Sequence, residues 1–281
     1  MDPTQQPPGA ASSGDLEGRT WHYGLVAQWW LNKQAQPEEL AFYGGAIRRF
    51  GEPALDLGCG TGRLLVPLVA EGLDIDGSDL SEDMLAGCRQ RAAAAGVDVQ
   101  VWAQPMRELA APRRYRTIYI CDSFGIGGSR WNDRQALRRI HDYLEPGGAL
   151  VMSTELPYDD ASDWALWLPH GGDDLPRPWP DEPGRQVQPN GDVIVQWVRL
   201  AGFDPRVQRV VFEIRDQLVR DDAVVRKEQR RIAIAVYFEQ ELRLMLELAG
   251  FSDIRFEAGY TGREASVDDT NIVVIAQRAP A

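Results

Sequence analysis

Three glycines that follow an acidic residue are the clearest chemical signal in this chain. Gly58, Gly60 and Gly62 lie between a predicted strand and a predicted helix. Glycine has no Cβ, so a turn built from it lets a ligand approach the backbone closely. The first N–H groups of the following helix remain free for that ligand. Asp56, at the end of the strand, would repel a pyrophosphate but would attract an ammonium group. The turn therefore predicts a site for a cofactor that carries positive charge.

A second acidic residue, Asp79, closes the next predicted strand, about twenty residues after the glycine turn. A carboxylate in this place can accept hydrogen bonds from both ribose hydroxyls of a nucleoside cofactor. The competing interpretation is an NAD(P)-dependent oxidoreductase. Its loop has glycines at the first, third and sixth positions, whereas here they occupy the first, third and fifth.

Four segments closely resemble motifs of the class I S-adenosylmethionine (SAM) dependent methyltransferases. Residues 54–65 resemble the first motif and residues 76–85 the acidic-loop motif. Residues 115–124 resemble the fourth-strand motif, and residues 144–151 resemble the turn into the fifth strand. The resemblance implies a Rossmann-like methyltransferase with SAM as its cofactor, and it says little about the acceptor.

The resemblance also implies roles for single residues. It places Asp56, the glycine turn and Cys59 beside the methionine part of SAM, Asp79 on the ribose, and Leu80 against the adenine. Cys121, at the end of the fourth-strand motif, is expected to border the cofactor as well.

The loop after the third predicted strand departs from the family pattern. Many relatives carry an acid there that bonds the adenine amino group, whereas this chain has Gln104 followed by Met106. The Gln104 amide oxygen would supply the acceptor, and Met106 would cover the ring. An ordinary loop glutamine is the alternative at this position.

Methyl transfer from a sulfonium is an in-line displacement that depends mainly on alignment and on exclusion of water. A base is needed only if the accepting atom must lose a proton. Asp122 follows the fourth predicted strand, at the edge where the methyl group should lie, and is the first candidate to orient or deprotonate an acceptor. A carboxylate that caps the next turn is the equally simple structural alternative.

Two further residues are candidates for the site. His170 lies in a tryptophan-rich segment after the fifth predicted strand, where relatives place substrate-binding insertions, and is the second catalytic candidate. Tyr23 belongs to the amino-terminal helical region, which in this family often folds over the cofactor, and is expected to close the site. Simple packing is the alternative for both residues.

The elements that must position these residues alternate between strand and helix from residue 53 onward. This pattern predicts a doubly wound, mostly parallel seven-stranded α/β sheet, interrupted after the fifth strand by an antiparallel β meander. Five parts are predicted along the chain: a flexible tail (1–18), a helical cap (19–52), a SAM-binding core (53–156), a substrate lid with the β insertion (157–236), and a closing helix and strands (237–281).

Composition restricts the partners. The chain has 42 acidic and 30 basic residues and a net charge of −12, which disfavours nucleic acid and anionic membranes. Neither a signal peptide nor a transmembrane run is visible, so a cytoplasmic location is expected. The histidines and acids lack metal-ligand spacing, so no metal is expected.

The sequence as a whole predicts methyl transfer from SAM to an N or O atom of a small-molecule acceptor. A non-catalytic SAM-binding sensor or scaffold is the second alternative beside the oxidoreductase. The exposed strands of the meander would allow two copies to pair, so a homodimer is expected.

Overall fold

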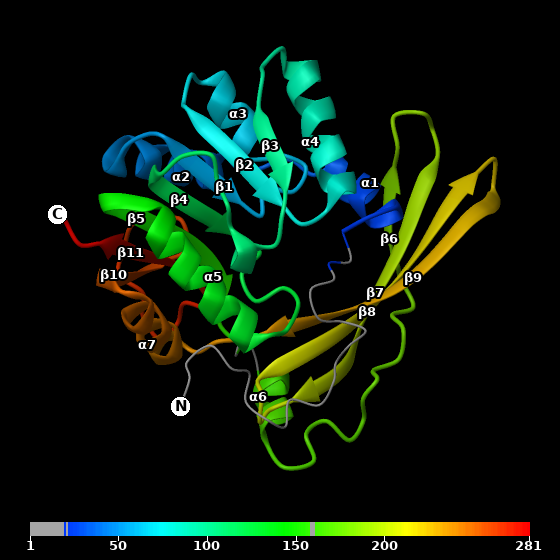
Figure 1. The fold of residues 1–281 in the computed structure, drawn as a ribbon. Coiled ribbons are helices and arrows are strands. Elements are labelled where there is room, and N and C mark those ends of the chain that lie inside the picture. The colour runs from blue at the N-terminus through cyan, green and yellow to red at the C-terminus, as the bar shows by residue number, and fades with distance from the viewer. Residues whose placement is uncertain (1–19, 21, 158–160) are drawn as a thin grey trace.

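A seven-stranded sheet forms the centre of the computed structural model, which describes Thr20 and residues 22–157 and 161–281 (Figure 1). The strand order is β10-β11-β5-β4-β1-β2-β3. β1 to β5 run parallel to one another, and β11 pairs antiparallel with both β5 and β10. The strands are β1 (Ala54–Leu57), β2 (Ile75–Asp79), β3 (Gln100–Ala103), β4 (Tyr115–Cys121), β5 (Leu144–Glu155), β10 (Phe251–Ala258) and β11 (Asn271–Arg278). The predicted doubly wound fold is confirmed.

Helices cover both faces of this sheet and create two hydrophobic cores. On one face, α2 (Pro37–Phe50), α3 (Leu65–Ala70) and α4 (Glu82–Ala95) enclose one buried cluster. On the other face, α5 (Arg130–Tyr143) and α7 (Glu239–Ala249) enclose the second. Because helices bury both faces of this sheet, its parallel strands consist mostly of apolar residues.

Local sequence signals explain where α4 begins and ends. The Ser81 hydroxyl accepts a hydrogen bond from the Met84 N–H, as expected of an N-cap. Gly96 ends the helix in the left-handed conformation, which glycine adopts without steric cost. The carboxyl end of β2 and its Asp79 are therefore joined to α4 by a well-defined turn.

Within the segment predicted as a helical cap, the two helices have different places. α2 packs against the central sheet and buries Tyr43, Ile47 and Phe50. α1 (Leu25–Leu31) instead lies on α4 and on strand β8 (Arg209–Arg220) of the segment inserted after β5. Only the segment before α2 therefore reaches toward the insertion. The predicted tail, residues 1–18, falls outside the described residues.

The insertion after β5 is a four-stranded antiparallel sheet with the order β6-β7-β8-β9. It projects to one side of the central sheet, and a short helix, α6 (Ala161–Trp167), precedes it (Figure 1). Its strands are β6 (Gly184–Val187), β7 (Val193–Asp204), β8 (Arg209–Arg220) and β9 (Ala223–Ala235). The antiparallel meander is confirmed, and β6 is an additional short strand that the pattern did not predict.

The insertion is hydrogen-bonded to the loop that follows β4. The Ala235 N–H donates to the Gly125 carbonyl at 2.9 Å, and the Gly127 N–H donates to the Ala233 carbonyl at 2.8 Å. The end of β9 therefore lies directly beside the loop that leads into α5. Among the described residues, none of the helices is long and apolar enough to cross a membrane.

Candidate active site

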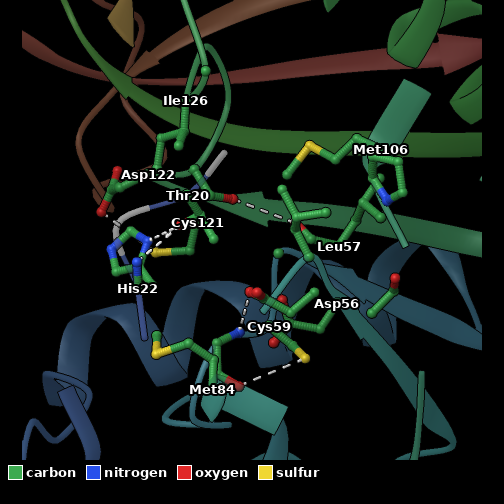
Figure 2. Close-up of a pocket in the computed structure, with 18 of the residues that line it drawn as sticks. Thr20, His22, Asp56, Leu57, Cys59, Met84, Met106, Cys121, Asp122 and Ile126 are labelled. Atoms are coloured by element: carbon green, nitrogen blue, oxygen red, sulfur yellow. Dashed lines mark hydrogen bonds between the residues drawn. The ribbon is translucent and has the colours of Figure 1, made fainter. Parts of the chain in front are cut away.

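A cavity lies at the carboxyl ends of β1, β2 and β4, where doubly wound sheets bind their ligands. Figure 2 shows Met84 and Cys59 on one side of this space and Met106 and Ile126 on the other. Most of the residues predicted to bind the cofactor line it: Asp56, Gly58, Cys59, Gly60, Asp79, Leu80, Gln104, Met106 and Cys121. Asp122 lines it too, so the structure brings these predicted residues together around one cavity.

The glycine turn leaves no room for side chains at two points. Gly58 has a φ of 88°, and a Cβ there would collide with the Ser123 hydroxyl and lie 3.0 Å from Met106 Cε. A Cβ at Gly60 would lie 3.0 Å from Met84 Cε, and its φ is 54°. Both glycines therefore keep open the backbone surface that faces the cavity.

The structure places Gly62, which is also predicted to bind the cofactor, against α4. It does not line the cavity; a Cβ at this position would lie 2.6 Å from Cys88 Sγ on α4. Its φ of 72° is also in the left-handed region. Gly62 therefore allows close packing of the turn against α4, behind the site rather than in it.

A buried carboxyl group, Asp56, and a half-buried one, Asp79, line the cavity. Burial raises the pKa of Asp56 to about 7, because a charged carboxylate loses its hydration there. Burial also raises the pKa of Asp79, although its Oδ2 accepts the Gly60 N–H at 2.9 Å and its Oδ1 accepts the Ser81 N–H at 2.8 Å. These hydrogen bonds fix the Asp79 carboxyl beside the glycine turn.

The loop after β3 forms the wall near Leu80. Gln104 Oε1 already accepts the Ala110 N–H at 3.0 Å, and its buried Nε2 has no hydrogen-bond partner in the part of the chain that the structure describes. The amide oxygen is thus engaged by the backbone, and its role as an acceptor for the adenine stays a prediction. Met106 lines the same wall, as predicted.

Asp122 lies at the other end of the cavity, immediately after β4. The Ser153 hydroxyl donates to Asp122 Oδ1 at 2.6 Å and accepts the Asp122 N–H at 3.1 Å. The backbone at Asp122 has a φ of 53°, which is uncommon for a residue with a side chain. Its side chain is 44% exposed, so the carboxylate is held in place but still accessible.

An arginine that the sequence did not single out lies beside Asp122. Arg63 pairs with Glu39 at 2.5 Å, lies 3.1 Å from Cys121 Sγ and approaches Asp122 Oδ2 at 4.0 Å. A carboxylate oxygen of Glu39, a carboxylate oxygen of Asp122 and the Cys121 Sγ, each a potential metal ligand, lie within 4.8 Å of one another. Arg63 supplies the positive charge among them. Burial and the nearby Asp122 raise the pKa of the Cys121 thiol to about 12.

The prediction for Tyr23 is not supported by its position, because the adjacent residue lies in the cavity instead. Tyr23 lies under the Arg230 guanidinium of β9, whose Cζ is 4.0 Å from the ring centroid. His22 lines the cavity, and its Nδ1 is 2.6 Å from the Thr20 hydroxyl. Burial lowers the pKa of His22 to about 3, so its ring is neutral.

His170 does not reach the cavity. Its side chain is 85% exposed, its φ is 69°, and its Nδ1 lies 3.1 Å from Asp173 Oδ2. The predicted catalytic role of His170 is therefore not supported by its position in the insertion loop.

A buried carboxyl group in α5 was missed by the sequence analysis. Asp133 lines the cavity together with Ser129 and Asn132, and its Oδ2 accepts the Tyr237 hydroxyl at 2.5 Å. Burial raises the pKa of Asp133 to about 7. No local pattern marks such a residue, since it lies within an ordinary amphipathic helix.

Comparison with known proteins agrees with this geometry. A family model described as a methyltransferase domain matches residues 54–148. A putative methyltransferase from Geobacillus sp. (strain WCH70) is 30% identical over 218 residues, which are 64% of this chain and 88% of that protein. The chain belongs to the class I SAM-dependent methyltransferases. Neither an NAD(P)-dependent oxidoreductase nor a non-catalytic sensor is favoured by these matches.

Two solved structures share the fold of this methyltransferase. A SAM-dependent methyltransferase from Clostridium acetobutylicum ATCC 824 has a TM-score of 0.68 at 15% identity, over 91% of this chain and 96% of that one. A sugar N-methyltransferase from Streptoalloteichus sp ATCC 53650 has a TM-score of 0.65 at 17% identity, over 93% and 97%. At these identities the two structures show a common architecture.

The cavity of this methyltransferase fits SAM. Gly58 and Gly60 have no side chains, so a ligand can approach their backbone closely. The buried Asp56 gains a counter-ion if an ammonium group binds beside it, which removes the cost of its ionisation. Asp79 and Leu80, which are predicted to contact the ribose and the adenine, both line this cavity. SAM, once bound, supplies an activated methyl group.

Proposed function

We propose that this methyltransferase transfers the methyl group of SAM to a nitrogen or oxygen atom of a small-molecule acceptor. The observation that carries the proposal is the position of Asp122, which lines the cavity at the carboxyl end of β4 and remains accessible. The structurally similar sugar N-methyltransferase has a small-molecule acceptor by its name, which supports a small-molecule acceptor for this chain as well. A net charge of −12 disfavours a nucleic-acid acceptor.

The chain's own residues would align the reactants rather than form a covalent intermediate. The glycine turn, Asp56 and Asp79 would hold the cofactor, and Asp122 would orient the acceptor. The neutral His22 and Thr20 would help to exclude water from the same space. Alignment of this kind can contribute about 7–11 kcal/mol to lowering a barrier.

Turnover of SAM in the presence of small-molecule panels tests the proposal directly. We expect S-adenosylhomocysteine (SAH) to accumulate with at least one amine or hydroxyl compound and not with RNA, DNA or peptide pools. Asp79→Ala should abolish SAH binding in calorimetry while circular dichroism stays unchanged, because the ribose loses its acceptor. Product only with a macromolecular pool would reject the small-molecule assignment.

Two wider expectations are part of this proposal. The enzyme would act in the cytoplasm, and two copies would pair through the strands of the insertion. Val224 and Val225 are exposed near the start of β9 and offer apolar surface for such a pair. Sedimentation of the purified chain at several concentrations measures the second expectation; a monomer throughout would exclude it.

A further inference from the structure

We propose that the acceptor is an amine, and that Asp122 is the group that recognises its nitrogen. This inference rests on the proposed function, because it assumes that a methyl group is transferred in this cavity. It narrows the acceptor class from nitrogen or oxygen to nitrogen. Three features support an amine: the placement of Asp122, the charges around it, and the position at which positive charge develops during transfer.

Asp122 is placed for a ligand rather than for the fold. Ser153 fixes both its backbone N–H and its Oδ1, so one carboxylate oxygen is already engaged. Among the described residues, Oδ2 lies 3.5 Å from the Cys121 thiol, a hydrogen-bond distance for sulfur, and 4.0 Å from the Arg63 guanidinium. An uncommon backbone conformation that is held by neighbouring groups occurs most often at functional sites. The carboxylate therefore presents an accessible acceptor at a fixed position.

The charged groups around Asp122 leave its negative charge incompletely balanced. The nearest cation, Arg63, is already in a 2.5 Å ion pair with the buried Glu39. Cys121 is a neutral thiol, because burial raises its pKa to about 12. Burial likewise raises the pKa of the nearby Tyr260 hydroxyl, so it adds no positive or negative charge at neutral pH.

The remaining charges on the cavity wall do not change this balance. Among the described residues that line the cavity, the cations are Arg63 and Arg107, and the acids besides Asp122 are Asp56, Asp79 and Asp133. Asp56 and Asp79 are assigned to the cofactor, and Arg107 lies on the wall formed after β3. The end of the cavity at β4 is therefore suited to a cation and unfavourable for an anion.

Transfer to an amine moves positive charge toward Asp122. The acceptor nitrogen first loses its proton to water, so that its lone pair is free and Asp122 stays ionised. The bond from nitrogen to the methyl carbon then forms as the carbon–sulfur bond breaks, the electron pair of that bond stays on sulfur, and the positive charge passes to nitrogen. A fixed carboxylate beside the nitrogen stabilises that developing charge. A phenolate or carboxylate acceptor would instead be repelled by Asp122.

The test uses binding, so it does not depend on knowing the acceptor. Sinefungin is a SAM analogue that carries a primary amine where SAM carries its methyl group, whereas SAH has no group there. Calorimetry gives the ratio of the SAH and sinefungin dissociation constants for each variant. We expect the wild-type chain to prefer sinefungin, and Asp122→Asn to lower that preference about three- to tenfold while SAH affinity stays the same.

The variants are chosen so that each outcome decides the proposal. Asparagine tolerates a positive φ and keeps an oxygen for Ser153, so Asp122→Asn should fold normally. Asp173→Asn removes the same charge from an exposed residue outside the cavity and is the matched control. An unchanged preference in Asp122→Asn, or an equal loss in Asp173→Asn, overturns the proposal. So does a loss of SAH binding in Asp122→Asn, because Asp122 would then serve the cofactor.

An acceptor panel separates this inference from the proposed function. SAH formation with phenols or carboxylic acids and with none of the amines would refute the amine assignment and leave small-molecule methyl transfer intact. Failure of the wild-type chain to bind SAH at all would refute the proposed function itself. Product with amines, lost in Asp122→Asn and retained in Asp173→Asn, supports both.

Discussion

Cofactor affinity should depend on pH through one buried carboxyl group. Asp56 has a pKa of about 7 in the cofactor-free chain because it is buried. In the proposed binding mode the ammonium group of the cofactor pairs with ionised Asp56, so binding below pH 7 would first have to remove a proton from Asp56. Affinity for SAH should therefore rise with pH up to about 7 and level off above it.

The magnitude follows from the ionised fraction of Asp56. A carboxyl of pKa about 7 is roughly 90% ionised at pH 8 and roughly 10% ionised at pH 6, so SAH should bind about tenfold more weakly at pH 6, a loss of about 1.4 kcal/mol. The raised pKa of Asp79 changes affinity in the same direction. Titration calorimetry of SAH from pH 5.5 to 8.5 measures this dependence.

Asp56→Asn separates the contribution of Asp56 from that of Asp79. The variant should bind SAH more weakly at pH 8 and should lose most of the dependence between pH 6 and 8. Calorimetry in buffers of different ionisation enthalpy should show that the wild-type chain releases protons on binding SAH near pH 6. Wild-type affinity that is constant between pH 6 and 8, or that falls as the pH rises, would refute the reasoning.

Three further predictions follow from single side chains. Gly58→Ala should abolish SAH binding because a Cβ would collide with the Ser123 hydroxyl, while Gly191→Ala, also at positive φ but in open space, should bind SAH normally; equal affinities would contradict this. Asp133 has a native pKa of about 7 against an ordinary value of 3.8, so its stabilisation is complete below about pH 4 and is lost as the pH rises through 7. Between pH 4 and 7 the free energy of unfolding should fall by about 4 kcal/mol more in the wild-type chain than in Asp133→Asn, as denaturant unfolding measures. His170→Ala should leave SAH binding and turnover unchanged, and a tenfold fall in kcat would restore this exposed residue to the site.

The parts of the site that sequence could predict are those whose signal is local. The glycine turn, Asp79 and Asp122 lie at the carboxyl ends of β1, β2 and β4, which are neighbours in the sheet. The alternation of strand and helix makes these strands parallel, so their ends meet at one edge. The different positions of Gly60 and Gly62 relative to the cavity could not be predicted from the local sequence, because Gly62 packs against Cys88 in a neighbouring helix.

Residues whose role depends on distant segments were harder to predict. The choice between His22 and Tyr23 is decided by Arg230, which lies on β9 and holds the tyrosine ring outside the cavity. Asp133 reaches the cavity because α5 packs beside the loop after β3, and its helical pattern says only that one face is buried. His170 lies in a segment without hydrophobic periodicity, so its sequence does not predict whether a side chain points toward the cavity or toward solvent.

The insertion is joined to two segments that are remote from it in sequence. Glu228 accepts the Leu25 N–H at 3.1 Å, Arg230 stacks on Tyr23, and the end of β9 is hydrogen-bonded to the loop at Gly125. A change of acceptor by recombination would therefore have to exchange three pieces together: the stretch before α2, the loop after β4, and the insertion. The glycine turn and Asp79 lie outside those three pieces, but the stretch before α2 also accepts hydrogen bonds from Thr61 and Ser81, so an exchanged stretch would have to keep these contacts with the cofactor half.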